Sequence, residues 1–276
     1  MRVLILGDRG FIGSALHREL QSRDHLVVTP DSIGAGDDIS DLQICEQLIV
    51  SSAPDVVVNL VGRGATRGSA SVLEMQRVNV LAAGNVATVI AGMSTKRPLL
   101  VHCGSSLEPL PGSLPESAYA ASKAQGSARV AQCLPSGPVA LLRLGSVYGP
   151  GMPKGRLVSE LVADLSAGVP IRLDWPDRRR DFCFIEDVVG HIASVVESGM
   201  GGTGTFVVRA HAAVRLRDLA YAVADLLGAS RSLVDARSRA AQDLFQQVPD
   251  QPSDARILDC DTPLVDGLIA TLRSMA

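Results

Sequence analysis

The sequence predicts an α/β fold in which a parallel β-sheet is wound by helices on both faces. Short runs of β-branched and other apolar residues alternate with longer segments rich in alanine and leucine. The apolar runs are continuous, which is typical of strands buried on both faces. The chain has 276 residues, of which 46% are hydrophobic, so it is long enough for one large domain with a smaller second one.

The expected elements follow one another in alternation. Strands are expected at residues 3–6, 25–29, 55–61, 98–102, 139–144 and 205–208, and helices at residues 11–21, 42–51, 72–93 and 119–133. Glycine and proline cluster after residue 149, where the pattern changes. We therefore expect residues 1–150 to form a nucleotide-binding domain to which residues 180–210 return. Residues 151–179 and 211–276 are expected to form a smaller, C-terminal substrate-binding domain.

Composition and charge argue against several classes of protein. The chain has 26 Lys+Arg and 29 Asp+Glu, a net charge of −3, which does not favour binding to nucleic acid. Its five cysteines show no Cys-x-x-Cys spacing, so we expect neither a disulfide framework nor a metal site. No apolar stretch is long enough to span a membrane, and no signal peptide is apparent. These features predict a reduced, soluble, cytoplasmic protein.

A glycine-rich loop follows the first expected strand directly. Gly7, Gly10 and Gly13 form a G-x-x-G-x-x-G pattern that opens the first expected helix. Glycines in this setting let the backbone turn tightly and approach a pyrophosphate, and the helix N-terminus offers free N–H groups to the phosphates. The sequence therefore predicts a Rossmann-type site for a dinucleotide.

Two charged residues bear on which dinucleotide binds. Asp31 lies 24 residues after Gly7, where a carboxylate binds the ribose hydroxyls of NAD and repels the 2′-phosphate of NADP. Arg9, in the loop, favours the opposite choice because a guanidinium can pair with that phosphate. The cofactor is therefore expected to be NAD or NADP, with a preference for NAD.

A tyrosine and a lysine are spaced to lie on one helix face. Tyr119 and Lys123 are four residues apart in the last of these expected helices. A nearby ammonium group favours the phenolate, so we expect Lys123 to lower the pKa of Tyr119 and to make it an acid or base near neutral pH.

With these motifs, nearly the whole chain resembles the extended short-chain dehydrogenases/reductases, the NAD-dependent epimerase/dehydratase family that acts on nucleotide-linked sugars. The matching segments are the glycine loop, Asp38-Ile39, Asn59-Leu60-Val61-Gly62, Asn79-Val80, the Tyr119/Lys123 pair, residues 143–151, and Arg180-Asp181-Phe182 with Asp187-Val188. The resemblance implies cofactor contacts at Gly7, Gly10, Phe11, Ile12, Asp38, Ile39, Leu60, Val61, Gly62, Tyr119 and Lys123, beside Arg9 and Asp31. It also implies a homodimer formed by the helices at residues 72–93 and 119–133.

The resemblance further implies a serine as the third catalytic residue. Ser105 and Ser106 stand at the expected place, and we favour Ser105 as the catalytic one. Ser106 and Arg180 are then expected to contact the substrate, with Arg180 at its diphosphate. The chain departs from the family directly afterwards, where residues 107–111 replace the usual Val-Tyr-Gly and shorten the loop.

Several other residues have plain structural explanations or weaker functional ones. His102 and Cys103, at a strand end, are expected to be packing residues. Asp187 is expected to be the N-cap of a helix. Arg63, together with Arg67 in the same loop, is a weaker candidate for an anionic substrate.

The expected reaction follows from the constellation. A 4,6-dehydratase would need an acid/base pair directly after the serine, and Ser106-Leu107 does not supply it. We therefore expect a ketoreductase acting on a nucleotide-linked deoxysugar. The alternatives are an epimerase that retains its NAD and a non-catalytic, dinucleotide-sensing protein of the same fold.

Overall fold

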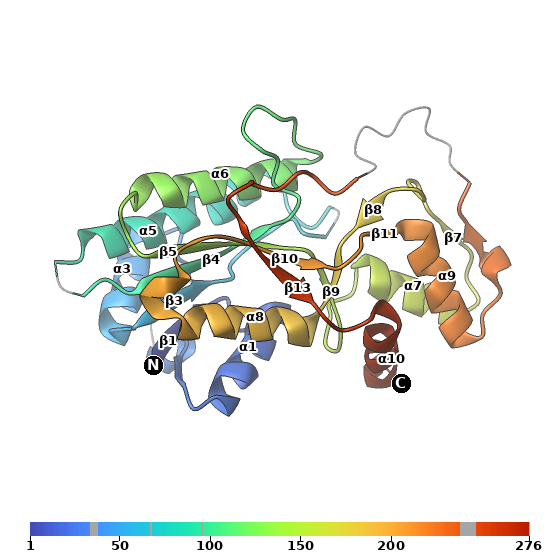
Figure 1. The fold of residues 1–276 in the computed structure, drawn as a ribbon, viewed down its shortest axis with the longest axis horizontal. Coiled ribbons are helices and arrows are strands. Elements are labelled where there is room, and N and C mark those ends of the chain that lie inside the picture. The colour runs from blue at the N-terminus through green and yellow to red at the C-terminus, as the bar shows by residue number, and fades with distance from the viewer. Residues whose placement is uncertain (34–37, 67, 95, 238–246, 276) are drawn as a thin grey trace.

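The computed structural model describes residues 1–33, 38–66, 68–94, 96–237 and 247–275. Its centre is a seven-stranded parallel sheet in the order β13-β10-β5-β4-β3-β1-β2 (Figure 1). The strands are β1 (Arg2–Leu6), β2 (Leu26–Val28), β3 (Val56–Asn59), β4 (Leu99–Ser105), β5 (Val139–Leu144), β10 (Gly204–Ala210) and β13 (Arg256–Cys260). The strand order reverses between β1 and β3, where ligands bind in doubly wound sheets. The predicted fold class is confirmed.

Helices cover both faces of this sheet. On one face lie α1 (Phe11–Ser22) and α8 (Ile185–Glu197), and on the other lie α3 (Leu42–Ser52), α5 (Ala82–Gly92) and α6 (Ala118–Cys133) (Figure 1). Alternate residues of β1 enter the two cores: Val3 and Ile5 pack on the side of α1 and α8, whereas Leu4 and Leu6 pack on the side of α3 and α5. The continuous apolar run therefore reflects burial on both faces.

The expected helix at residues 72–93 has a change of hydrogen-bonding pattern in its middle. It consists of α4 (Val72–Met75), the π-helical turn η1 (Gln76–Leu81) and α5. Ser71 and Glu74 form a capping box at its start. π-Helical turns are often found at functional sites, and this one contains Asn79, which contacts the site described below.

Smaller elements cluster beyond the edge of the main sheet. They are α7 (Leu157–Ser166), α9 (Leu216–Leu227), α10 (Leu264–Met275), the 3-10 turn η3 (Arg231–Leu233) and three two-stranded pairs, whereas the 3-10 turn η2 (Gly199–Gly202) follows and contacts α8. The pairs join β6 (Ser146–Tyr148) to β9 (Phe182–Phe184), β7 (Ile171–Arg172) to β12 (Val234–Asp235), and β8 (Arg179–Arg180) to β11 (Val214–Arg215). The short α2 (Pro30–Ile33) follows β2.

Two sequence-based expectations are wrong at the C-terminal side. Residues 256–260, expected in the smaller domain, form β13 and pair with β10 in the main sheet. Asp187 is not an N-cap: α8 begins at Ile185, and the Asp187 carboxylate accepts hydrogen bonds from the main-chain N–H and side-chain hydroxyl of Thr262, at 3.0 and 2.9 Å. Asp187 thus joins α8 to the segment that follows β13.

Among the described residues, no helix combines the length and apolarity needed to cross a membrane.

Candidate active site

The glycine loop forms one wall of a groove at the carboxyl ends of β1 and β3. Gly7 has a φ of +89°, and its main-chain oxygen accepts the N–H of Gly10 at 3.0 Å. A Cβ atom on Gly13 would lie 2.1 Å from that same oxygen, so the helix can approach the loop only with glycine there. The groove has a volume of about 480 Å³ and opens at the N-terminus of α1. Its backbone cradle therefore fits a dinucleotide pyrophosphate.

Most of the predicted cofactor residues lie in or beside this groove. Its lining includes Gly7, Arg9, Gly10, Asp38, Ile39 and Val61. Phe11, Ile12 and Leu60 pack against the core beneath it. The side chain of Asp31 is exposed 3.9 Å from Arg9, while the neighbouring Pro30 lines the groove. The structure thus brings the predicted residues together at the switch point of the sheet.

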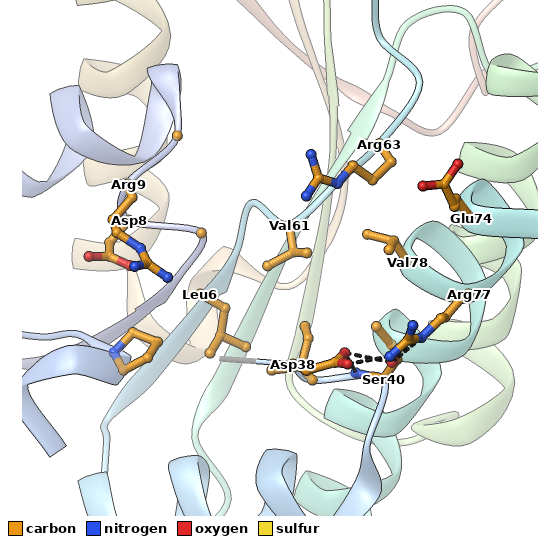
Figure 2. A pocket seen from close by; sticks show the side chains of 15 residues that line it. Leu6, Asp8, Arg9, Asp38, Ser40, Val61, Arg63, Glu74, Arg77 and Val78 are labelled. Atoms are coloured by element: carbon orange, nitrogen blue, oxygen red, sulfur yellow. Dashed lines mark hydrogen bonds and ion pairs between the residues drawn. The ribbon is translucent and has the colours of Figure 1, made fainter. Parts of the chain in front are cut away.

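Charged side chains stand at the other wall, and two of them, Glu74 and Arg77, were not expected from the sequence. Figure 2 shows Arg63, Glu74 and Arg77 facing the groove across from the glycine loop. Arg77 forms an ion pair with Asp38, and the hydroxyl of Ser40 donates to the same carboxylate at 2.5 Å. The hydrogen bonds from Ser40, reinforced by Arg77, hold the pKa of Asp38 below its usual value. Arg67 lies outside the described residues.

The three predicted catalytic residues meet at the end of β4. Ser105 is the last residue of this strand, and Tyr119 and Lys123 lie one turn apart near the start of α6. The side chain of Ser105 lies near that of Tyr119 and lowers the pKa of the phenol, and its hydroxyl accepts the main-chain N–H of Leu107 at 3.2 Å. The Lys123 ammonium is buried and donates to the main-chain oxygen of Cys103 at 2.7 Å. Strand and helix together therefore position a serine, a tyrosine and a lysine as one cluster.

The expected effect of Lys123 on Tyr119 is wrong. Burial raises the pKa of Tyr119, and the nearby charge of Glu108 raises it further, whereas Arg156 and Ser105 lower it. Burial also lowers the pKa of Lys123, against the opposing effect of Glu108. The Lys123 ammonium is directed to the carbonyl of Cys103, so removal of the phenol from water outweighs any stabilisation of the phenolate.

Asn79 joins the cofactor groove to the catalytic helix. From the π-helical turn, its amide donates to the hydroxyl of Ser122 at 2.8 Å and to the main-chain oxygen of Arg63 at 2.9 Å. Its side-chain oxygen accepts the N–H of Arg63 at 2.8 Å. Gly62 directly precedes Arg63, and a Cβ atom on Gly62 would lie 3.8 Å from the Lys123 ammonium. The loop after β3 is thus fixed against the helix that carries Tyr119 and Lys123.

A second pocket opens on the side of the smaller elements. It has a volume of about 370 Å³, and its lining includes Tyr148, Arg156, Trp175, Arg178 and Arg180. The guanidinium of Arg178 lies 5.0 Å from the centre of the Trp175 ring. Arg180 lies in β8 and is buried.

The predicted substrate residues are held by partners that sequence analysis missed. Arg180 donates to both carboxylate oxygens of Glu116, at 2.9 and 2.7 Å. Ser106 is buried, and its main-chain oxygen accepts a hydrogen bond from Gln251 at 2.8 Å. The only hint of Glu116 in the sequence is that it stands three residues before Tyr119. The contact of Gln251 with Ser106 depends on the tertiary fold.

His102 and Cys103 are packing residues, as expected. Both are buried, and the side-chain amide of Asn59 lies 3.4 Å from Nδ1 of His102. Burial and the charge of Lys123 lower the pKa of His102 to about 3, so its ring is neutral. Burial raises the pKa of Cys103 to about 12, which leaves its thiol protonated. Neither group has the character of a nucleophile or an acid.

Comparison with known proteins places this geometry in a family. The model of the NAD dependent epimerase/dehydratase family matches residues 3–208. The chain belongs to this family. Membership confirms the resemblance on which the site was predicted, and NAD or NADP is the cofactor. A sequence search of the curated proteins gives no match.

Several solved structures have a similar fold. MoeE5 in complex with UDP-glucuronic acid and NAD has a TM-score of 0.79 at 22% identity, covering 100% of this chain and 99% of that one. The Bordetella bronchiseptica enzyme WbmG, in complex with NAD and UDP, has a TM-score of 0.78 at 21% identity, covering 99% of this chain and 94% of that one. The Thermus thermophilus UDP-glucose 4-epimerase in complex with NAD has a TM-score of 0.77 at 21% identity, covering 99% of this chain and 98% of that one.

Proposed function

We propose that the protein is an NAD(P)-dependent oxidoreductase that reduces a keto group of a nucleotide-linked deoxysugar, with Ser105, Tyr119 and Lys123 as its catalytic residues. The observation that carries the proposal is the placement of Ser105, at the end of β4, next to Tyr119 and Lys123 of α6 and beside the dinucleotide groove. A serine, a protonated phenol and an ammonium group at one point can bind a carbonyl oxygen and protonate it.

Each member of the cluster has a distinct task. When bound, the dinucleotide supplies the hydride. Tyr119, whose pKa is raised by burial, keeps its proton near neutral pH and donates it to the substrate oxygen as negative charge develops there. Ser105 holds that oxygen by a hydrogen bond. One of the three N–H donors of Lys123 is used by Cys103, and the others serve the cofactor ribose.

The charges around the groove favour NAD over NADP. Arg9 lies 3.9 Å from Asp31, and Arg77 is paired with Asp38. A 2′-phosphate brought to this end of the groove would meet two carboxylates, and the arginines nearest to them are already engaged.

The second pocket suits the nucleoside diphosphate part of a substrate. Arg156 and Arg178 supply cationic donors for phosphate oxygens, and Trp175 offers an aromatic surface. Arg180 lines the same pocket with its guanidinium held by Glu116, and we assign it to substrate binding on this basis. Ser106 is assigned to substrate binding from its place beside Ser105. The UDP and UDP-sugar complexes of the structurally similar proteins support a nucleotide-linked substrate.

The alternative reaction is epimerisation, and the fate of the cofactor separates the two. An epimerase reuses its NAD and retains it, whereas a reductase exchanges the cofactor in every turnover. The purified protein is denatured and the released small molecules are identified by mass spectrometry. NAD in a one-to-one ratio with the chain favours the epimerase, and its absence favours the reductase.

Activity assays decide whether the site is catalytic at all. Oxidation of NADH and NADPH is followed with a panel of nucleotide-linked keto sugars, with the Tyr119→Phe variant as the blank. Turnover that depends on Tyr119 supports the reductase. A protein that binds the dinucleotide, retains none of it and neither reduces nor epimerises any nucleotide-linked sugar would be a dinucleotide-sensing protein of the same fold.

We also propose a homodimer formed by the face of α4, η1, α5 and α6. A mainly apolar groove of about 550 Å³ on this face is lined by Leu73, Gln76, Arg77, Val80, Leu81 and Arg129. Leu73 and Leu81 are 79% and 52% exposed, and exposed apolar side chains gathered in one groove are typical of an interaction surface. Light scattering should give a dimer for the parent protein, a monomer for Leu73→Glu and a dimer for Leu114→Glu, whose equally exposed leucine lies outside this face. A parent protein that is monomeric at micromolar concentration would defeat the proposal.

A further inference from the structure

A fully buried carboxylate lies directly beneath the catalytic serine. Glu108 has 0% exposure, and its Oε1 accepts the main-chain N–H of Ser105 at 2.7 Å. Its Oε2 lies 3.7 Å from Nε of Arg143 and has no hydrogen-bond partner among the described residues.

The surroundings of Glu108 are built to hold it. A Cβ atom on Gly104 would lie 2.2 Å from Oε1, so glycine at this strand position leaves room for the carboxylate. Nη1 of Arg143 donates to the main-chain oxygen of Glu108 at 3.0 Å. Gln251 closes the other side of the turn through its hydrogen bond to Ser106. Two protein segments far apart in sequence therefore fix residues 105–108.

Burial of a charge in this way is costly unless the charge is compensated. The guanidinium of Arg143 lies 3.7 Å from the Glu108 carboxylate, which is beyond hydrogen-bond distance. Arg143 therefore compensates the negative charge of Glu108 only in part, and the rest of that charge acts on the catalytic residues. The charge of Glu108 raises the pKa of Tyr119 and also that of Lys123. Both effects favour the protonated forms of the two side chains.

We propose that Glu108 is a positioning residue of the active site, which fixes the main chain of the Ser105 turn and places a negative charge beneath the serine–tyrosine–lysine cluster. It does so without touching the substrate. Its contribution to turnover rests on the proposed function, because only a reduction needs Tyr119 as a proton donor. Its electrostatic effect on Tyr119 exists in the protein alone.

The test measures the titration of Tyr119 directly. The chain has three tyrosines, so ¹³Cζ-labelled tyrosine gives three NMR signals, and the one lost in Tyr119→Phe belongs to Tyr119. Glu108→Gln keeps a side-chain oxygen for the Ser105 N–H and removes the charge. The titration midpoint of Tyr119 should move to lower pH in this variant. Glu46→Gln, an exposed change on α3, is the matched control and should leave the midpoint unchanged.

A second variant gives the opposite sign. Arg143→Gln removes the cation that faces Glu108, so the midpoint of Tyr119 should move to higher pH. An unchanged midpoint in folded Glu108→Gln would overturn the proposal. If that variant does not fold, absence of an upward shift in Arg143→Gln would overturn it instead. The titration needs neither substrate nor cofactor, so an inactive parent protein would defeat the proposed function and leave this result standing.

Discussion

The side-chain ammonium of Lys123 donates a hydrogen bond to the main-chain oxygen of Cys103 at 2.7 Å and so joins α6 to β4. Because Tyr119 precedes Lys123 by one helical turn, the same bond sets the position of the phenol beside Ser105, two residues after Cys103. The lysine therefore acts on Tyr119 through geometry more than through its charge.

Lys123→Met should weaken both the fold and the site. The change leaves the buried oxygen of Cys103 without a donor, which costs about 1–3 kcal/mol in the free energy of unfolding. Cofactor affinity and turnover should both fall, because the ammonium also serves the ribose in our proposal. Chemical denaturation and cofactor titration measure the two effects. Lys96→Met, at an exposed lysine paired with Asp55, should cost less than about 1 kcal/mol and leave cofactor binding intact.

Tyr119→Phe should remove most turnover while leaving cofactor affinity nearly unchanged. Phenylalanine keeps the packing of the ring and deletes the hydroxyl that delivers the proton. General acid/base catalysis contributes about 10²–10⁴-fold, and the loss in kcat should lie in that range. Tyr221→Phe on α9 is the control and should retain the parental rate. A Tyr119→Phe enzyme with more than about half of the parental rate would remove Tyr119 from the mechanism.

The pH dependence of turnover should reflect a protonated Tyr119. Burial raises its pKa above the ordinary tyrosine value of about 10, so the donor form predominates at neutral pH. Reduction should stay constant with respect to this group from neutral pH upward and fall only as pH rises through the raised pKa. Oxidation of the alcohol, which needs the phenolate, should become faster as pH rises over the same interval. Rates in both directions measured across pH check the sign, and a reductive rate that already falls with a Tyr119 ionisation near neutral pH would contradict it.

Gly10→Val should abolish cofactor binding in a folded protein. Gly10 has an extended conformation with a φ of −74°, which valine can adopt, and the nearest heavy atom to an added Cβ is the oxygen of Gly7 at 3.2 Å. The larger side chain would project into the groove that we assign to the pyrophosphate. Fluorescence titration with NADH and NADPH measures the loss, and circular dichroism checks the fold. Parental affinity in the folded variant would show that the loop assignment is wrong.

Gly126→Ala should destabilise the contact between α6 and the π-helical turn. An added Cβ would lie 2.1 Å from the main-chain oxygen of Asn79, and neither backbone can yield without moving its helix. Overpacking of this kind costs about 1–3 kcal/mol. Gly92→Ala is the matched control, since nothing lies within 4 Å of its Cβ, and it should stabilise the protein by about 0.4–1 kcal/mol. Urea unfolding of both variants gives the two free energies, and equal stabilities would contradict the prediction.

Local patterns were sufficient for six of the seven strands of the sheet and for the glycine loop and the tyrosine–lysine pair of the site. The apolar run at residues 3–6 is continuous because both faces of β1 are covered, and that requirement is visible in four adjacent residues. Gly7, Gly10 and Gly13 are recognisable because a tight loop between strand and helix needs glycine at those positions. Tyr119 and Lys123 are recognisable because helical periodicity alone places them on one face.

Contacts between distant segments were not visible in the same way. The seventh strand, β13, was assigned to the smaller domain because its pairing with β10 depends on the path of the chain between them. The partners of Ser106 and Asp38, namely Gln251 and Arg77, come from elements remote in sequence. Glu108 stood in the segment that was seen to depart from the family, yet its burial under Ser105 could not be inferred from neighbouring residues.

The sequence by itself determined the parallel α/β fold, the dinucleotide loop and the Tyr119/Lys123 pair, because each depends on spacing within one element or between adjacent ones, and the family resemblance added Ser105 to complete the set. The tertiary structure alone decided the ionisation of that set. The pKa of Tyr119 depends on how far the phenol is removed from water and on the charges of Arg156 and Glu108, which reach it through space. Electrostatic interactions and desolvation follow distance in the folded molecule and not separation along the chain, so the direction of this shift appeared only when the segments were brought together.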